Sequence, residues 1–365
     1  MNAVLGATAT PEKRRTDWLL YISAGLLLLI GLLTLWSATG GGSEFKKQLV
    51  WLVVGLPFAV LFYKVDPRFW ALYSRTLYVL TLLLLIMPWL PGFKYVINDA
   101  NRWISFGAFQ FQPSEPAKLL MILTFADFLA RWRSQLRTVR GLAISFLHVC
   151  IAFALVLVQP DLGTSLVFIA LWLGMSLVAR QRLRLIALAL VAGCMLFLGA
   201  WKVGVLKDYQ VARVADLVRG GGYQTKIAIN AIGSGKGIGS GYNKGPMKES
   251  GLVPVQESDF IFTVIAEETG FVGSVLTILA FAFFLWRVWL VSLNSTVPLF
   301  KYMAAGVFVV FAFHTIVNLF MVVALFPVVG VPLPFVSYGG SKMVLLFAML
   351  GLLFNIRNRE RVLAF

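Results

Sequence analysis

The strongest constraint on this chain is a series of apolar runs, each about as long as a bilayer is thick. Runs of roughly 20 apolar residues follow one another, and a helix of that length spans the hydrocarbon core of a membrane. Hydrophobic residues make up 59% of the sequence and charged residues 13%, whereas soluble domains are about 25% charged. The alternation typical of an outer-membrane barrel is absent from the sequence. The sequence therefore predicts an all-α polytopic membrane protein.

We expect about ten transmembrane helices in a single membrane domain covering residues 1–365. Both termini then lie in the cytoplasm, and one large extracytoplasmic loop, at about 203–259, joins the seventh and eighth spans. The basic start runs directly into a full-length span, so no cleavable signal is expected. The predicted spans are 17–37, 47–63, 69–89, 115–131, 142–159, 162–179, 183–203, 260–286, 299–324 and 334–356.

The net charge of +16 could suggest a nucleic-acid partner, but the placement of the basic residues argues against one. They gather in alternate loops, which is the positive-inside pattern of a membrane protein. We therefore expect contact with anionic membrane lipids and no nucleic acid. The clusters are Lys13, Arg14 and Arg15; Arg131, Arg133, Arg137 and Arg140; Arg180, Arg182 and Arg184; Arg287 and Lys301; and Arg357, Arg359 and Arg361.

Polar residues stand immediately before and within the start of the fourth span. Glu115 and Lys118 are three residues apart, so they share one face of that helix. They form either a purely structural ion pair or part of a polar site. Arg102 and Trp103 precede them and belong either to that site or to an interfacial anchor, a role that Trp often has.

Two further outward segments carry polar residues near the membrane. Asp161 lies in the tight turn between the fifth and sixth spans; an acid at that depth suggests function, although Asp is also common in turns. Ser337 and Tyr338 follow Pro332 and Pro334, which forbid a regular helix. Irregular backbone at membrane depth must face protein or water, so this pair either lines a cavity or only packs.

The large outward loop is rich in glycine and in basic residues. Its run GGGYQTKIAINAIGSGKGIGSGYNKG starts at Gly220 and lacks the spacing of a phosphate-binding P-loop. We expect a flexible stretch whose backbone N–H groups can approach a diphosphate; the alternative is a solvated linker. Its cations are Lys207, Arg213, Arg219, Lys226, Lys236, Lys244 and Lys248.

Asp259 stands at the entrance of the eighth span, two residues after Glu257. A carboxylate there is stabilised by the helix dipole, so Asp259 either caps the helix or takes part in chemistry. Glu267 and Glu268 lie deeper in the same span. Because buried acids are costly in a membrane, both must meet a cation, a polar cavity or a proton.

Five segments together resemble the SEDS family (shape, elongation, division and sporulation). They occur in the order expected for that family between residues 101 and 341, and the chain resembles the RodA branch more than the FtsW branch. The segments are RWISFGAFQFQPSEPAKL, PDLGTS, GYQTKIAINAIGSGKGIGSG, ESDFIFTVIAEETGFVG and FPVVGVPLPFVSYGGS.

The resemblance implies a peptidoglycan glycosyltransferase that polymerises lipid II at the outer face of the bacterial inner membrane during cell elongation, in complex with a class B penicillin-binding protein. The family's essential acid corresponds to Asp259. This chain departs from the family at Glu257, where His or Ser is usual, and at Lys342, where a second small residue is common. The positions matching the family's cavity and final motif are Trp103, Glu115, Lys118 and Asp161, then Ser337 and Tyr338.

The expected mechanism needs one base and several cations. Asp259 would take the proton from the GlcNAc 4-hydroxyl, while Lys118, Arg102 and loop lysines, or a divalent cation such as Mg or Mn, stabilise the departing lipid diphosphate. No metal-ligating residue is assigned. The rivals are a lipid II flippase, an FtsW-like division enzyme and a non-catalytic scaffold. The ionisable groups lie mostly toward the outer half of the membrane. A flippase would also need a polar route to the cytoplasmic side, so this distribution argues for the enzyme.

Overall fold

A computed structural model describes residues 17–90, 95–97, 100–106, 109–202, 215–217 and 220–363. Each of the ten predicted spans coincides with a helix or, for the third, with two consecutive helices. Six of the described helices are long and apolar enough to cross a membrane by themselves. The spanning elements are α1 (Trp18–Thr39), α2 (Ser43–Lys64), α3 (Pro67–Leu72) with α4 (Ser74–Ile86), α5 (Ser114–Arg131), α6 (Val139–Val158), α7 (Leu162–Val178), α8 (Leu183–Lys202), α12 (Ile261–Asn294), α13 (Pro298–Val322) and α14 (Gly340–Leu363).

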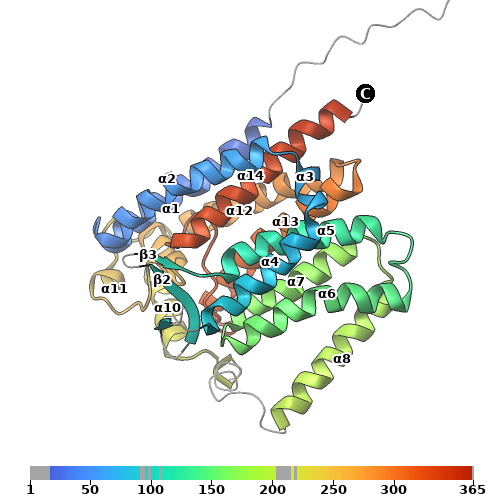
Figure 1. Ribbon diagram of the computed structural model, residues 1–365. Coiled ribbons are helices and arrows are strands. Elements are labelled where there is room, and N and C mark those ends of the chain that lie inside the picture. Colours follow the sequence, from blue (N-terminus) through green and yellow to red (C-terminus); the bar gives the residue numbers. More distant parts are fainter. Residues whose placement is uncertain are drawn as a thin grey trace, which may run out of the picture.

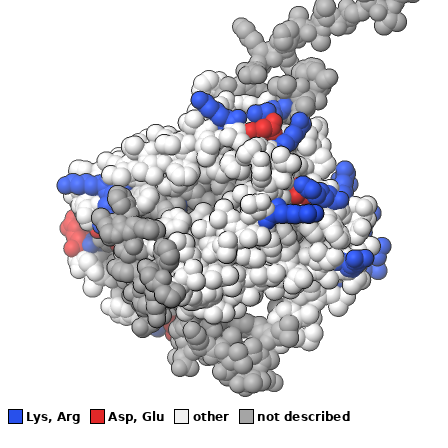
Figure 2. All heavy atoms as spheres, viewed as in Figure 1, with Lys and Arg blue, Asp and Glu red and all other residues white. Residues whose placement is uncertain are grey.

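The helices form a bundle with two distinct ends (Figure 1). Helix α14 lies along α2, α13 packs against α5, α7 and α12, and α8 extends away from the rest and contacts α6. The first and last described residues lie at the same end, as an even number of spans requires. On the visible face, most Lys and Arg gather at that end, a smaller basic group lies beside acidic residues at the opposite end, and the broad middle is uncharged (Figure 2). By the positive-inside rule this is the cytoplasmic end.

Short polar residues set where several helices begin. Asp17 accepts a hydrogen bond from the backbone N–H of Leu20, and Asp66 accepts one from Arg68. Thr138 binds the N–H of Gly141 at the start of α6. Each side chain satisfies a donor that the first helical turn leaves free. Apolar residues on the outward faces, such as Phe271 (70% exposed) and Leu276 (61%) of α12, are in position to meet lipid.

Three predicted spans differ from the observed helices by an interruption or by more than five residues at one end or both. The third is interrupted at Tyr73, between α3 and α4. The eighth continues eight residues further, to Asn294. The tenth was predicted to begin at 334, but α14 begins at Gly340. Prolines before it and a left-handed backbone at Phe335 (φ 64°) hold the preceding segment in turns.

A small antiparallel sheet precedes α5, and the sequence analysis did not predict it. It consists of β1 (Tyr95–Ile97), β2 (Ala100–Phe106) and β3 (Phe109–Phe111), in the order β1–β2–β3. Tyr95 pairs with Trp103, and Ile104 with Phe111. The sheet lies at the outer end of the bundle, near α10 (Tyr223–Ser234) and α11 (Pro246–Glu249) (Figure 1). It carries Arg102 and Trp103 to that end.

In the described part of the outer loop, several backbone groups of the glycine run are hydrogen-bonded to protein, whereas the sequence analysis expected them to be free to approach a diphosphate. Helix α12 is broken at Gly270 (φ 66°, ψ −160°), and the glycine run pairs with the exposed backbone there. Ser240 N–H donates to Glu267 O (3.0 Å), Gly241 N–H to Glu268 O (3.0 Å) and Phe271 N–H to Lys236 O (2.8 Å). These N–H groups are therefore occupied by protein carbonyls. Lys207, Arg213 and Arg219 lie outside the described residues.

Both deep acids of α12 have polar partners; Glu268 meets a cation, as predicted, whereas Glu267 meets backbone N–H groups, which the sequence analysis did not anticipate. Glu268 is 4% exposed and its Oε1 lies 2.8 Å from Lys248 Nζ. Lys248 Nζ also donates to Ser37 Oγ of α1 (2.9 Å). Glu267 accepts the N–H groups of Met247 (2.6 Å) and Lys248 (3.2 Å) at the start of α11. The loop is thus fixed to α1 and α12 by buried charges.

Candidate functional site

Asp259 lies in the turn that leads into α12, and its side chain is half-buried. The main-chain oxygen of Asp259 accepts a hydrogen bond from Asn318 Nδ2 of α13 (2.9 Å). The same amide nitrogen donates to Val331 O (2.8 Å). Asn318 is fully buried, so it joins the Asp259 turn to the segment between α13 and α14.

Ser337 fixes the other side of this turn. Its hydroxyl donates to Ser258 O (2.6 Å) and accepts the N–H of Leu333 (2.9 Å). The N–H of Tyr338 donates to Glu257 O (2.8 Å). The predicted residues Ser337 and Tyr338 are therefore brought against the Asp259 turn, but the observed bonds are structural. Tyr338 is half-buried.

The predicted residues Arg102 and Asp161 meet in a second polar cluster. Asp161 is 4% exposed and caps α7 by accepting the N–H of Thr164 (3.1 Å). Its other oxygen accepts Gln112 Nε2 (2.8 Å), and Arg102 Nη1 lies 3.5 Å from Oδ1. Asp161 is thus both a helix cap and an ion-pair partner. Trp103 follows Arg102 in β2 and is half-buried.

Glu115 and Lys118 form the predicted ion pair at the start of α5, with 2.8 Å between Oε2 and Nζ. Both residues are 1% exposed. Glu115 also lines a cavity of about 20 Å³ with His314, Ser337 and Lys342, which is enough for one water molecule. The small cavity connects the base of α5 with the segment that supports Asp259.

Glycines allow the two polar regions to approach each other. A Cβ at Gly163, in the first turn of α7, would lie 2.3 Å from Val329 O. Gly330 has a left-handed φ of 70°, and a Cβ there would lie 3.6 Å from Asp259 Oδ2. The segment Val329–Val331 therefore lies between the Asp161 turn and the Asp259 carboxylate. A cavity of about 320 Å³, partly lined by Pro327 and Val328, opens next to this segment toward the start of α10.

Three residues of this region were missed or given no role by the sequence analysis. Gln112 binds Asp161, and Gln48 of α2 both donates to Ser337 O (3.4 Å) and accepts the N–H of Gly339 (3.2 Å). Lys342 was noted only as a family departure and lines the small cavity with Glu115. A buried Gln in an apolar helix is the signal that could have identified Gln48. Among the described residues, no group of three or more His, Cys, Asp and Glu is close enough to hold a metal ion.

Comparison with known proteins identifies the family. A family model described as "Cell cycle protein" and named for FtsW, RodA and SpoVE matches residues 15–362. The chain belongs to this FtsW/RodA/SpoVE family.

Relatives from more than one branch of the FtsW/RodA/SpoVE family are similar to the chain. Stage V sporulation protein E of Bacillus subtilis is 32% identical over 96% of this chain and 100% of its own length. Peptidoglycan glycosyltransferase MrdB of Escherichia coli K12 is 30% identical over 93% of this chain and 92% of its own. A probable peptidoglycan glycosyltransferase FtsW of Thioalkalivibrio sulfidiphilus is 32% identical over 96% and 91%. The predicted preference for the RodA branch stays a prediction.

Solved structures of FtsW/RodA/SpoVE proteins have the same fold. One, from a study of polymerization and crosslinking by a peptidoglycan synthase complex, has a TM-score of 0.81 and 28% identity over 94% of this chain and 98% of its own. The rod shape determining protein RodA of Thermus thermophilus has a TM-score of 0.70 and 28% identity over 95% and 97%. The chain is a multi-pass membrane protein of this family.

Asn318 gives a first test of how the site is held together. We expect Asn318→Leu to leave the carbonyls of Asp259 and Val331 without their donor, lowering the free energy of unfolding by about 1–3 kcal/mol. Chemical denaturation in mixed micelles measures this free energy. Asn294→Leu, at an exposed position at the end of α12, is the matched control. An equal effect of the two substitutions would contradict the role of Asn318.

Proposed function

We propose that this chain polymerises lipid II into glycan strands at the outer face of the inner membrane, with Asp259 as the general base. The observation that carries the proposal is the convergence of Asn318, Gly330 and Ser337 on the Asp259 turn at the outer end of the bundle. Relatives named peptidoglycan glycosyltransferases match almost the whole chain. The activity is therefore a hexosyl transfer from a lipid-diphosphate donor.

In the proposed reaction, the Asp259 carboxylate accepts the proton of the GlcNAc 4-hydroxyl as its oxygen attacks C1 of MurNAc. The bond from C1 to the diphosphate breaks at the opposite face, and a single displacement of this kind inverts the carbon. The lipid diphosphate leaves as a stable anion and needs no proton. General-base assistance contributes about 10²–10⁴-fold to such a step.

The cations expected to stabilise the diphosphate start out paired. Lys118 is held by Glu115, and Arg102 by Asp161. Each ion pair has almost no net charge, so the pairs attract the diphosphate weakly through charge alone. Their contribution comes instead from N–H groups that the pairing already holds in a fixed orientation. Lys342 lines the same small cavity as Glu115 and adds a further positive charge on this side of the bundle. A divalent cation assisting the leaving group stays a prediction.

The partner is proposed on the same basis. One similar structure comes from a complex that coordinates polymerization with crosslinking. We propose that this chain likewise works with a crosslinking enzyme, a class B penicillin-binding protein, and we assign the pair to cell elongation. An FtsW-like role in division is the second candidate, because FtsW relatives are as similar as MrdB.

An assay in detergent distinguishes an enzyme from a flippase or a scaffold. Purified protein, alone and with its penicillin-binding partner, is mixed with lipid II, and the products are separated by gel electrophoresis after labelling. We expect glycan strands from the complex. A flippase would give no product here, because detergent removes the membrane across which it acts, and a scaffold would also leave lipid II unchanged. Lipid II left unchanged by the complex would contradict glycosyltransferase activity.

A further inference from the structure

A second cavity lies at the cytoplasmic end of the bundle, opposite the Asp259 region. It is open to solvent and has a volume of about 440 Å³, which is within the range of small-molecule sites, about 300–1,000 Å³. Three separate connections form its walls: α5 to α6, α7 to α8, and α12 to α13. None of the residues assigned to the proposed reaction lies at this end of the molecule.

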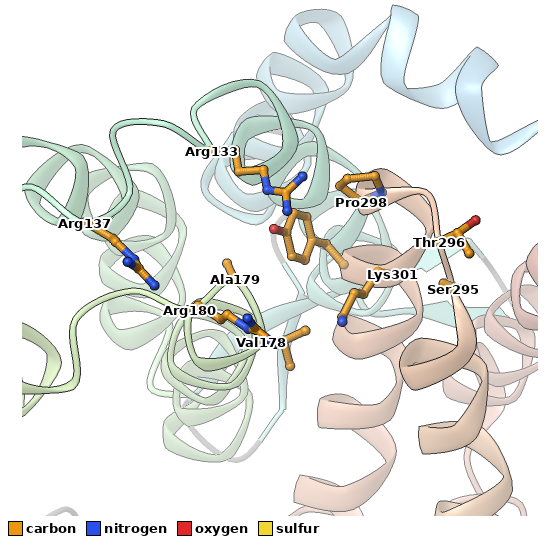
Figure 3. Close-up of a pocket in the computed structure, with 10 residues that line it drawn as sticks. Arg133, Arg137, Val178, Ala179, Arg180, Ser295, Thr296, Pro298 and Lys301 are labelled. Carbon is orange, nitrogen blue, oxygen red and sulfur yellow. The ribbon is translucent and has the colours of Figure 1, made fainter.

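Four cations from the α5–α6 connection, the α7–α8 connection and the first turn of α13 are turned toward the same space (Figure 3). Within the described part of the chain, none of the four is within ion-pair distance of a carboxylate, whereas neighbouring Arg131 is paired with Asp127 at 2.8 Å. Like charges that face one cavity repel each other unless an anion lies between them. The cations are Arg133, Arg137, Arg180 and Lys301.

The backbone at Arg180 supports a specific placement of its side chain. Arg180 follows α7 in a left-handed conformation (φ 57°), in a turn closed by bonds from Arg180 N–H to Leu177 O (3.0 Å) and from Gln181 N–H to Ser176 O (3.1 Å). Glycine usually occupies this position because other residues are strained there. The turn is fixed by Gln181, whose Nε2 donates to Ser145 Oγ of α6 (3.2 Å). The strained arginine is therefore held at the cavity.

The other two walls are also preformed. In the α5–α6 connection Leu136 is buried, and the close approach of Gly141 to Gln135 O leaves no room for a side chain at position 141. Helix α13 begins at the cavity with Pro298, and its N-cap residue is Val297, whose apolar side chain cannot accept a hydrogen bond from the first turn. The positive end of the dipole of this 25-residue helix adds to the field of the four cations.

We propose that this cavity binds a phosphate group, supplied by the headgroup of an anionic lipid in the cytoplasmic leaflet. The cavity lies at the ends of spans α7 and α13, where lipid headgroups are located, and Val178 and Pro298 give it apolar walls beside the cations. Anionic lipids are concentrated at the cytoplasmic surface of membranes and attract basic residues there. The bound lipid holds the three connections together on the side of the membrane remote from the reaction.

Thermal unfolding and native mass spectrometry of the purified full-length protein in detergent test this proposal. The probes are phosphatidylglycerol, phosphatidylcholine and inorganic phosphate. The variant Arg133→Gln/Arg180→Gln/Lys301→Gln removes cavity charges, and Arg140→Gln/Arg182→Gln/Arg184→Gln removes the same charge from exposed positions of the same surface. We expect phosphatidylglycerol binding to weaken by roughly 100-fold in the cavity variant and to change little in the control.

Arg180→Gly keeps the test decisive if the triple variant fails to fold. Glycine relieves the left-handed strain, so we expect the protein without added lipid to unfold at the same or a higher temperature. Its affinity for phosphatidylglycerol should nevertheless fall by about fivefold, the effect of one basic residue near an anionic surface. If Arg180 had only a structural role, its replacement would not lower the affinity for phosphatidylglycerol while leaving the unfolding temperature unchanged or higher.

Two results would overturn the proposal in different ways. Equal phosphatidylglycerol binding by wild type, Arg180→Gly and the cavity variant would exclude a phosphate site here. Stabilisation by inorganic phosphate that equals the effect of phosphatidylglycerol, and is lost in the cavity variant, would exclude the lipid as the source and assign the site to a free phosphate compound.

Discussion

Asp259→Asn is expected to reduce glycan synthesis to about 1% or less of the wild-type rate, while the protein stays folded. The amide cannot accept the hydroxyl proton, so the general-base contribution of about 10²–10⁴-fold is lost. The fold is retained because Asn318 binds the main-chain oxygen of Asp259 rather than its carboxylate. The measurement is the initial rate of lipid II polymerisation by the purified complex, together with its unfolding temperature.

Glu257→Gln is the matched control for this substitution. Glu257 is also half-buried and lies two residues away, and its main-chain oxygen accepts the Tyr338 N–H (2.8 Å). We expect this variant to retain most of the activity. Wild-type rates from purified Asp259→Asn would remove Asp259 as the base. Loss of activity in the Glu257 variant alone would transfer the role to Glu257.

Lys248→Met is expected to cause the largest loss of stability. It leaves Glu268, which is 4% exposed, as a buried charge without its cation. Removing one partner of a buried ion pair lowers the free energy of unfolding by about 3–5 kcal/mol. Because the pair fixes the outer loop to α1 and α12, limited proteolysis should also cleave the loop faster. Denaturation in mixed micelles measures the free energy.

The control and the double variant separate the ion pair from a general effect of losing a lysine. Lys244→Met, at an exposed position of the same loop, should change the free energy of unfolding by less than about 0.5 kcal/mol. Combining Lys248→Met with Glu268→Gln should cost less than the sum of the two single substitutions. Purely additive losses would mean that the two side chains do not stabilise each other.

Interactions between residues close in the chain were predictable. The pairing of Glu115 with Lys118 follows from helical spacing, and the capping by Asp161 follows from the chemistry of a turn. The need of Glu267 and Glu268 for partners follows from the cost of burying acids. The partners themselves, the α11 backbone and Lys248, lie about 20 residues away, and no sequence pattern specifies them.

The glycine run shows the limit of composition most clearly. Many glycines in a polar loop predicted flexibility and free N–H groups, but the run packs into the break in α12. A Cβ at Gly239 would lie 2.1 Å from Glu268 O, so glycine serves close approach here. Composition alone shows only that a glycine allows unusual backbone conformations. The packing against neighbouring backbone shows what the glycine is used for.

The sequence by itself determined that this chain crosses a membrane as a helical bundle, which residues carry its charge and which family it resembles, because apolar length and short motifs are local properties. Only the tertiary structure decided that Asn318, Gly330 and Ser337 surround the Asp259 turn, and that three distant connections form one basic cavity. These contacts join residues tens to hundreds of positions apart, and they depend on how the helices pack.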